Sequence, residues 1–492
     1  MPRTNLYTVE DIESLWEYID AMAELQHIVD LLDALAATRA DDPALTIEDE
    51  TWSYRRLAEA SRRAASRLHA LGVQQDDIVV LPMANSHEQA SFFLGAWRLG
   101  ATPLPLSHTV PEIELAHIMA AAGARIVLRE GQDLSGEPLW EAPSIPASRC
   151  RAQASGGSTG LPKVIIDTEP CTVDPGEDHW GWTSGPAMFV PGPTYHAEPM
   201  NHLIGGLTRG VHVVMMRKFD AARAISLIDR HKAHWALYVP TMMNRILKAA
   251  DAAGERHRLA SLKRVWHSAA ACPAWLKMAW IELVGPDAVW EIFGGSEGVS
   301  TTIISGREFH EHPGSVGRAA GNGEIAIFGA DGQPVPPGTV GEIFMRNKVD
   351  TRRFVVISEH KQRLNGEWES FGDLGHLDED GFLYLADRRI DMISTGGNNV
   401  YPAEVEAALQ SHPAVGDAVV FGQADDDLGE IVCARVYVET GAIGSDELLA
   451  HLTDRLSRYK LPRRIEFSPE PIRNDAGKVR RSSLALASKT SD

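Results

Sequence analysis

Alternating helical and strand-like segments along the chain are the strongest constraint on its fold. Residues 54–71 carry apolar side chains at helical spacing and are followed by Gly72, a typical helix stop. The apolar run at 78–83 fits a buried strand, 87–99 a second helix and 125–128 another strand. Such alternation is typical of a mainly parallel sheet with helices on both faces. We therefore predict an α/β fold.

The same alternation returns in the middle of the chain. We expect strands at 211–216, 235–239, 264–268 and 289–293, and helices at 220–231 and 240–253. A large N-terminal body of parallel sheets with flanking helices follows from this pattern.

The pattern then changes twice. From about residue 314 short strands alternate with Gly and Pro turns, which predicts a β-rich subdomain. Its expected strands are 323–328, 341–346 and 382–386. After the second change, near 387–402, two strand-like segments lie between expected helices at 402–411 and 445–457. We predict an N-terminal domain of residues 1–389 and a small, mobile α+β C-terminal domain of residues 390–492.

Charge and composition exclude several partners. The 492 residues include 47 basic and 67 acidic side chains, a net charge of −20, which disfavours nucleic acid and anionic membranes. No apolar run is long enough to cross a bilayer, and the acidic N-terminus does not resemble a signal peptide. The four cysteines are scattered, so we expect reduced thiols in a cytoplasmic protein, without a disulfide framework or a metal cluster.

A glycine-rich segment is a candidate anion-binding loop. It reads Ser155-Gly156-Gly157-Ser158-Thr159-Gly160-Leu161-Pro162-Lys163. Glycines let backbone N–H groups form a concave nest, while hydroxyls and a lysine add donors and positive charge. Pro162 before the lysine and Val164 after it exclude a Walker loop. Taken alone, the segment also fits a flexible turn.

Later segments carry side chains suited to a nucleotide and an organic acid, although each alone fits ordinary packing or a turn. In chain order they are Pro193-Thr194-Tyr195-His196, His267-Ser268-Ala269-Ala270, Trp290-Glu291-Ile292-Phe293-Gly294-Gly295-Ser296-Glu297, Phe371-Gly372-Asp373, Asp387-Arg388, Thr395-Gly396-Gly397-Asn398 and Asn474-Asp475-Ala476-Gly477-Lys478. In this order the segments resemble the motifs of the adenylate-forming superfamily. That superfamily includes acyl-CoA synthetases, peptide synthetase adenylation domains and luciferases. The resemblance covers nearly the whole chain and is nearest to stand-alone aryl- or acyl-CoA ligases and amide bond synthetases.

The sequence departs from the family pattern at a few positions. Ser296 stands where threonine is commoner, and the hydroxyl is kept. Ile390 occupies the hinge position where relatives usually carry Asp or Lys. Arg473 and Asn474 replace the usual proline and threonine before the Gly-Lys motif.

The resemblance implies a role for each matched residue. ATP is expected at Ser155, Gly156, Gly157, Ser158, Thr159, Gly160, Lys163, Ala270, Phe293, Gly294, Ser296, Asp373 and Arg388. The acid pocket is expected at Tyr195, His196, Ala269 and Gly295, and the acceptor channel at Gly396 and Gly397. Lys478, His196 and Glu297 are expected to be catalytic, and Glu297 is the expected Mg²⁺ ligand.

The implied reaction is ATP-dependent activation of a carboxylic acid, with an aryl or heteroaryl acid favoured. The products of this step are an acyl-adenylate and pyrophosphate. In the family the C-terminal domain then rotates, and the acyl group passes to an acceptor. We expect CoA as the acceptor, with a free amine as the alternative that Glu198 would steer. The expected cofactors are ATP and Mg²⁺, and the expected form is a monomer or homodimer without an attached carrier domain.

Overall fold

A computed structural model describes most of the chain. The described residues are 25–155, 163–178, 180–295, 299–348, 354–357, 362–364, 368–388, 391–395, 398–425, 428–438, 443–474, 477–479, 481 and 484. Two units emerge from the internal contacts: unit 1 comprises Met1–Arg217 and Arg353–Ile357, and unit 2 comprises Lys218–Arg352 and Ser358–Asp492.

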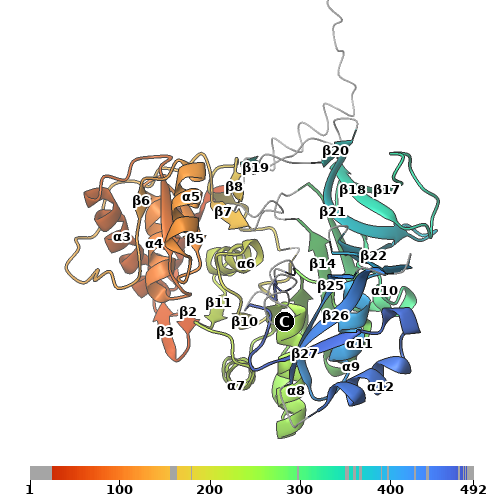
Figure 1. Cartoon of the computed structure of the whole chain (residues 1–492). Helices are drawn as coiled ribbons and strands as arrows, with labels where there is room; N and C mark the ends of the chain where they lie inside the picture. The colour runs from red at the N-terminus through yellow and green to blue at the C-terminus, as the bar shows by residue number, and fades with distance from the viewer. Residues whose placement is uncertain are drawn as a thin grey trace, which may run out of the picture. The chain divides into compact units, whose positions relative to one another are not determined.

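Unit 1 contains a short parallel sheet in the order β5-β4-β6. Figure 1 shows helices grouped around it, coloured red to orange. One face of this sheet packs against α5 and against the hairpin of β7 and β8. Ile78 and Val80 of that face share a buried apolar cluster with Leu115, Val164 and Ile166. The elements are α3 (Tyr54–Ala70), β4 (Ile78–Pro82), α4 (His87–Arg98), β5 (Thr102–Leu106), α5 (Glu112–Ala122) and β6 (Ile126–Val127).

That hairpin belongs to an antiparallel sheet in the order β19-β8-β7. β7 (Ala152–Ser155) and β8 (Lys163–Asp167) are consecutive, whereas β19 (Phe354–Ile357) comes from far along the chain. A further set of strands in unit 1 pairs β10 with β11 and β11 with β2 in parallel, and β2 with β3 antiparallel. The remaining elements of unit 1 are β1 (Gln26–His27), α2 (Ile28–Thr38), β2 (Pro43–Ile47), β3 (Glu50–Ser53), β9 (Thr172–Val173), β10 (Ala187–Val190), α6 (Ala197–Thr208) and β11 (His212–Met215).

Unit 2 begins with three parallel strands, β12, β13 and β14, joined by helices. β14 then pairs antiparallel with β15, and β15 pairs antiparallel with β16. The elements are α7 (Ala221–His231), β12 (Trp235–Tyr238), α8 (Pro240–Ala253), the 3₁₀ turn η1 (Arg256–Leu259), β13 (Arg264–His267), α9 (Ala274–Val284), β14 (Val289–Gly294), β15 (Thr301–Ser305), α10 (Gly306–Glu311) and β16 (Arg318–Ala319).

An antiparallel sheet of five strands follows in unit 2. Its core contains Ile327, Ile343, Met345 and Leu383, all buried. The strands are β17 (Gly323–Phe328), β18 (Gly341–Asn347), β20 (Gln362–Leu364), β21 (Trp368–Leu377) and β22 (Leu383–Arg388).

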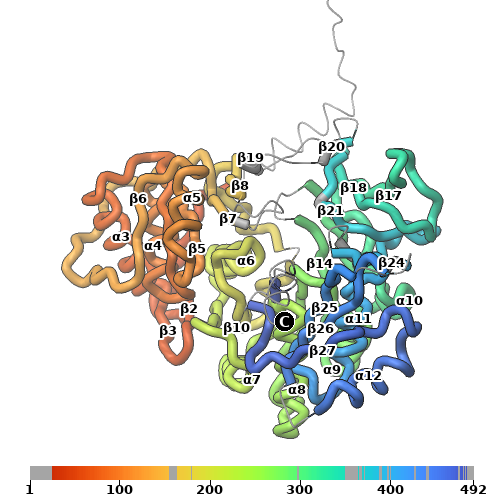
Figure 2. The backbone as a smooth tube through the Cα atoms, viewed as in Figure 1, coloured from red at the N-terminus to blue at the C-terminus, as the bar shows by residue number. Residues whose placement is uncertain are grey.

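The C-terminal part of unit 2 is a small α+β arrangement, drawn in blue in Figure 2. Its long β25–β26 hairpin and two helices share a core that includes Val405, Val420 and Leu448. In the same part of unit 2 Arg473 and Arg481 both pair with the buried carboxylate of Glu406. The elements are β23 (Ile393–Thr395), β24 (Asn398–Val400), α11 (Pro402–Gln410), β25 (Val415–Asp425), β26 (Gly429–Val438), α12 (Ser445–Thr453), η2 (Arg458–Lys460) and β27 (Arg464–Ser468).

These elements confirm the predicted fold class: parallel strands with flanking helices, a β-rich sheet and a small α+β part. Several predicted elements are shorter than expected. The strands at 125–128 and 211–216 are reduced to Ile126–Val127 and His212–Met215, and α12 ends at Thr453 instead of 457. The domain boundary between residues 389 and 390 stays a prediction.

Candidate active site

The predicted phosphate loop connects two strands of unit 1. β7 ends at Ser155 and β8 begins at Lys163, and the two residues face each other across the hairpin. The five residues Gly156, Gly157, Ser158, Thr159 and Gly160 lie outside the described residues. Their role in phosphate binding therefore stays a prediction.

Tyr195 and His196 lie in the loop that follows β10. Their rings are in contact, with centroids 4.5 Å apart and an interplanar angle of 52°. His196 is the N-cap of α6, and its backbone N–H donates to the carbonyl of Pro193 at 3.1 Å. Both side chains are half-buried, so the pair can form one wall of a pocket at this strand end.

A buried network of neutral side chains fixes this loop. Thr194 donates through its hydroxyl to Gln89 Oε1 at 2.7 Å and Asn85 Oδ1 at 3.1 Å. The Asn85 amide donates in turn to the carbonyls of Gly192 (2.9 Å) and Met216 (3.0 Å). Our sequence reasoning missed Asn85 and Gln89. The available signal was the presence of polar side chains at the start of an otherwise apolar helix.

Glu198, in the first turn of α6, is tied to a histidine. His202 Nδ1 accepts a hydrogen bond from Trp182 Nε1 (2.9 Å), so in neutral His202 the proton lies on Nε2. That nitrogen is 3.3 Å from Glu198 Oε2. Burial alone would raise the pKa of Glu198, but His202 and Arg151 hold the pKa below its usual value. Glu198 is therefore a partly buried carboxylate engaged by His202 instead of a plain surface charge.

In unit 2 the turn predicted to contact adenine and the acid follows β13 directly. Ser268 N–H donates to the carbonyl of Tyr238 at 3.2 Å, which ties the turn to the end of β12. Ala269 has a φ of 73°, a left-handed conformation that costs an L-residue roughly 1–3 kcal/mol. The structure thus places Ala269 and Ala270 at the carboxyl ends of parallel strands, where α/β sheets bind ligands.

The predicted adenine-stacking residue lies at the end of the adjacent strand. Phe293 is half-buried and packs against the cluster that contains Val299 and Val316. Gly294 is exposed, and a Cβ there would lie 2.7 Å from Thr301 Cγ2, so a side chain would force a shift. Gly295 follows directly and is half-buried. Ser296 and Glu297 lie outside the described residues, and their roles stay predictions.

A fully buried ionic cluster joins α9 to β13 and β14 beside these strand ends. Lys277 of α9 pairs closely with Glu291 Oε2, and His267 Nδ1 is 3.7 Å from Glu291 Oε1. Burial, followed by the charge of Lys277, lowers the pKa of His267 well below its usual value. Burial raises the pKa of Glu291 against the opposing charge and hydrogen bond of Lys277. Sequence reasoning missed this cluster, although isolated charged residues within the apolar segments AWLKMAWIELV and VWEIF were a usable signal.

The two residues expected at the ribose are cross-strand neighbours. Asp373 in β21 faces Arg388 in β22 in the antiparallel register. Gly372 precedes Asp373 with a φ of 81°, a conformation that favours glycine. Gly396 and Gly397, expected in the acceptor channel, lie outside the described residues. Their sequence neighbours Thr395 and Asn398 pair with each other across β23 and β24.

Lys478 lies on a closed turn. Its backbone N–H donates to Asn474 Oδ1 at 2.9 Å, and its carbonyl accepts from Asn474 N–H at 3.0 Å. Gly477 is buried, with a φ of 71°, and a Cβ there would lie 3.3 Å from Thr241 Oγ1 and 3.5 Å from Val239 Cγ2. The turn therefore packs against the segment that follows β12, and the Lys478 side chain is exposed there.

Several predicted residues of unit 2 thus meet at one edge of its parallel strands. The Lys478 turn contacts the segment after β12, and the Ala269 turn is tied to the end of β12. Gly294 ends β14, the neighbouring strand. The contributions of unit 1, Tyr195 and His196, likewise follow a parallel strand. No group of three or more His, Cys, Asp or Glu side chains suited to a metal occurs among the described residues.

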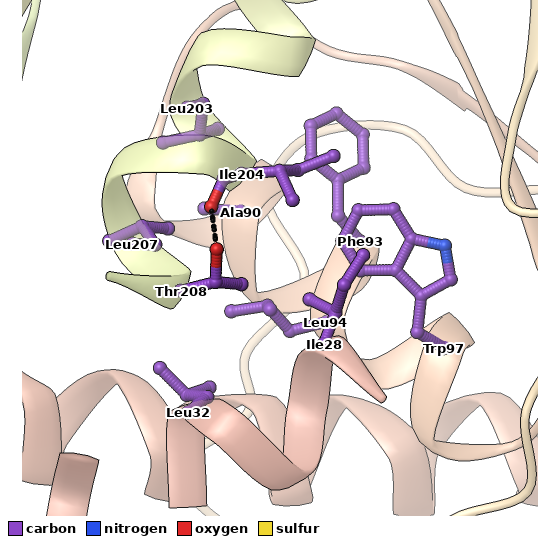
Figure 3. A pocket seen from close by; sticks show the side chains of 10 residues that line it. All are labelled: Ile28, Leu32, Ala90, Phe93, Leu94, Trp97, Leu203, Ile204, Leu207 and Thr208. Carbon is purple, nitrogen blue, oxygen red and sulfur yellow. Dashed lines mark hydrogen bonds between the residues drawn. The ribbon is translucent and has the colours of Figure 1, made fainter. Parts of the chain in front are cut away.

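An apolar cavity in unit 1 is distinct from these residues (Figure 3). It lies between α2, α4 and α6, and its one hydroxyl side chain, Thr208, donates to the carbonyl of Ile204 at 2.8 Å. No residue predicted for the site lines it. The lining residues are Ile28, Leu32, Ala90, Phe93, Leu94, Trp97, Leu203, Ile204, Leu207 and Thr208.

Two family models match the chain. The AMP-binding enzyme model matches residues 32–153 and 146–352, and the AMP-binding enzyme C-terminal domain model matches residues 404–478. In the part of the chain that the structure describes, no helix is long and apolar enough to cross a membrane.

Relatives and solved structures match over most of the chain. A 2-succinylbenzoate–CoA ligase of Geobacillus kaustophilus is 29% identical over 466 residues, 88% of this chain and 92% of that protein. A long-chain-fatty-acid–CoA ligase of Mycobacterium tuberculosis is 27% identical over 476 residues, 89% of this chain and 93% of that protein. The crystal structure of an anthranilate CoA ligase in complex with anthranoyl-AMP has a TM-score of 0.77 and 25% identity, and covers 94% of this chain and 97% of its own.

Proposed function

The chain belongs to the AMP-binding enzyme family, and on that premise we propose that it is an AMP-forming acid–CoA ligase. It activates a carboxylic acid as an acyl-adenylate, releases pyrophosphate and transfers the acyl group to CoA. The observation that carries the proposal is the convergence of the Lys478 turn and the Ala269 turn at the carboxyl ends of β12 and β13. This is the edge of an α/β sheet at which ligands bind.

Lys478 supplies the mobile positive charge of the first step. A carboxylate that attacks the α-phosphate of ATP brings two anions together, so a cation placed between them lowers the barrier. Lys478 is exposed on a turn whose backbone is closed by Asn474, and this turn contacts the end of β12 through Gly477. An exposed cation on a turn with a closed backbone suits transient bridging of the two reacting groups.

An aryl or heteroaryl acid fits the residues of unit 1 best. Tyr195 and His196 present two rings in contact at the end of β10, a surface that suits a flat ring better than a short aliphatic acid. Two of the relatives are named for acids that contain a benzene ring, 2-succinylbenzoate and anthranilate. The substrate class proposed here is therefore an aromatic carboxylic acid.

ATP and Mg²⁺ are the proposed cofactors. A magnesium ion, bound through carboxylate and phosphate oxygens, would neutralise charge on the phosphates. Its expected protein ligand, Glu297, lies outside the described residues. For the acceptor, Glu198 is already paired with His202, which makes it a poorer site for a cationic amine. We therefore propose CoA as the acceptor in preference to an amine. A cytoplasmic site of action is proposed from the reduced thiols alone.

The test supplies ATP, Mg²⁺ and a panel of aryl acids, with CoA and amines offered in separate reactions and products identified by mass spectrometry. A thioester without an amide supports the proposal. An amide without a thioester would replace CoA by an amine as acceptor.

A second measurement examines Lys478. In Lys478→Ala, acid-dependent exchange of pyrophosphate into ATP should fall by at least about 100-fold. Transfer from supplied acyl-adenylate to CoA should persist. Lys263→Ala is the matched control, because Lys263 is exposed just before β13, at the opposite end of the same strands. Normal exchange in Lys478→Ala would remove this lysine from the mechanism.

A further inference from the structure

Two of the scattered cysteines meet in unit 1, against the sequence expectation of isolated thiols. Cys150 and Cys171 are 21 positions apart in the chain, and their Sγ atoms are 3.4 Å apart. Both are free thiols, and both are buried. The sequence carried no signal for this contact, since neither residue belongs to a motif with close cysteine spacing.

Backbone hydrogen bonds hold the two residues beside each other. Cys150 N–H donates to the carbonyl of Glu169 at 2.9 Å, and Cys171 N–H donates to the carbonyl of Ala147 at 3.3 Å. The indole of Trp97 also donates to the carbonyl of Cys150, at 2.6 Å. Cys150 precedes β7 and Cys171 follows β8, so the thiols lie at the base of the hairpin that carries the predicted phosphate loop.

We propose that Cys150 and Cys171 form an oxidisable dithiol, a modification site that closes to an intramolecular disulfide in the presence of a hydroperoxide. A disulfide bond measures about 2.05 Å, so the sulfurs must approach by roughly 1.4 Å. Atoms already in contact cover that distance by small side-chain rotations. The backbone pairing keeps the two Cα positions in place while they rotate.

The reaction balances with one peroxide molecule. The sulfur of Cys150 attacks a peroxide oxygen, the O–O bond breaks, and a sulfenic acid and water form. The sulfur of Cys171 then attacks the sulfenic sulfur, and its proton leaves with the hydroxyl group as a second water. Two thiols are oxidised, and one hydrogen peroxide is reduced to two waters.

The order of the two cysteines follows from their surroundings. Cys150 is 8% exposed and Cys171 fully buried, so a small peroxide reaches Cys150 first. Burial, the neighbouring Cys150 thiol and the charge of Asp167 raise the pKa of Cys171 well above its usual value. Because the thiolate is the nucleophile, initial attack from Cys171 is the slower route.

The disulfide would restrain a defined segment. It closes residues 150–171 into a loop that contains the β7–β8 hairpin, while the reduced protein holds the same base only through hydrogen bonds. A cross-link that fits the native geometry removes entropy from the unfolded chain. We therefore expect oxidation to raise the melting temperature by at least about 3 °C. This inference does not depend on the proposed acid–CoA ligase activity.

The test uses the full chain, reduced, freed of reductant and then treated with stoichiometric hydrogen peroxide. Remaining thiols are alkylated, and the protein is digested with trypsin without reduction. Trypsin cuts after Arg149 and Arg151, so Cys150 leaves in the dipeptide Cys150-Arg151. Cys171 lies in the peptide 164–209, which contains no internal Lys or Arg. The expected product is this peptide carrying the dipeptide, with the link lost after dithiothreitol.

Two variants sharpen the result. Cys433→Ser should form the link like the wild type, because Cys433 contacts Gln423 and no second thiol. Cys150→Ser should lose the link and the rise in melting temperature. Should that variant fail to fold, the wild-type digest decides alone. The proposal is overturned if peroxide leaves both thiols free, oxidises them separately, or links either one to Cys272 or Cys433.

Discussion

The loops that carry candidate site residues are fixed by different chemistry in the two units. In unit 1 the loop after β10 is held by a neutral network of Thr194, Asn85 and Gln89. In unit 2 a buried ion pair joins Lys277 of α9 to Glu291 of β14, beside the end of β13. Neutral hydrogen bonds contribute individually modest amounts, while a buried charge is tolerated only with its partner. Both arrangements position a loop, but they should differ in their response to mutation and pH.

The largest expected effect comes from removing one ion. Lys277→Met leaves Glu291 buried without its counter-charge and should lower the free energy of unfolding by about 3–5 kcal/mol. Urea denaturation followed by circular dichroism measures this loss. Lys263→Met serves as the exposed control and should change stability by less than about 0.5 kcal/mol.

Removing both ions tests the interpretation. The double variant with Lys277→Met and Glu291→Leu should recover most of the loss, since an apolar pair of similar volume replaces a buried ion pair at little net cost. If the double variant were as unstable as Lys277→Met, the loss would reflect packing instead of an uncompensated charge.

A smaller effect is expected in the neutral network. Thr194→Val removes the hydroxyl that Asn85 and Gln89 accept from and should cost about 1–3 kcal/mol. Thr194→Ser keeps the hydroxyl and should remain closer to the wild type. Chemical denaturation of the two variants side by side gives the difference. A loss in Thr194→Ser as large as that in Thr194→Val would show that the hydroxyl and its hydrogen bonds do not alone account for the stability at this position.

The smallest effect is the contribution of His267 in unit 2 to the pH dependence of stability, to which the lowered pKa values of His27 and His87 in unit 1 also contribute. The folded pKa of His267 lies well below its ordinary 6.5, so the unfolded state binds the extra proton first as pH falls. Stability should decline below about pH 6.5 by at most about 1.4 kcal/mol per pH unit. Glu291, with its raised pKa, acts in the opposite direction as pH falls through that pKa.

A variant isolates the histidine in that experiment. His267→Gln should make the decline between pH 6.5 and 5.5 less steep, and the exposed His257→Gln should leave it unchanged. Stability measured across this range in all three proteins gives the comparison. A wild-type slope that persists in His267→Gln would show that other groups cause it.

Sequence patterns predicted the elements whose amphipathic or apolar character is continuous. The helix α3 and the strand β4 appeared within a residue or two of their expected bounds. The strand β5 was missed because Pro103 and Pro105 argue against a strand. It forms the edge of the order β5-β4-β6, where missing N–H groups are tolerated.

The helix α6 was missed for a different reason. Gly205 and Gly206 weaken its helical pattern, yet tertiary packing requires them. A Cβ at Gly205 would lie 2.5 Å from the Trp182 ring, and one at Gly206 would lie 2.4 Å from Met188 Sδ. Such close approaches come from distant parts of the chain and leave no local signal.

Motif resemblance named candidate site residues but not the residues that position them. Ala269, Gly294 and Lys478 were read from short motifs, and the structure places them at or beside the ends of parallel strands. The pairing of Lys277 with Glu291 depends on how α9 packs against β14, which a sequence pattern does not specify. The contact between Cys150 and Cys171 depends in the same way on the pairing of two separate segments.

The position of β19 has a consequence for the covalent topology. Residues 353–357 belong to unit 1, although the chain on both sides of them belongs to unit 2. A single cut after Arg217 would therefore leave the first fragment without a strand that pairs along all of Val164–Asp167. Fragments 1–217 and 218–492, produced as separate chains, should consequently reassociate by strand complementation, with β19 restoring the sheet that borders the predicted phosphate loop.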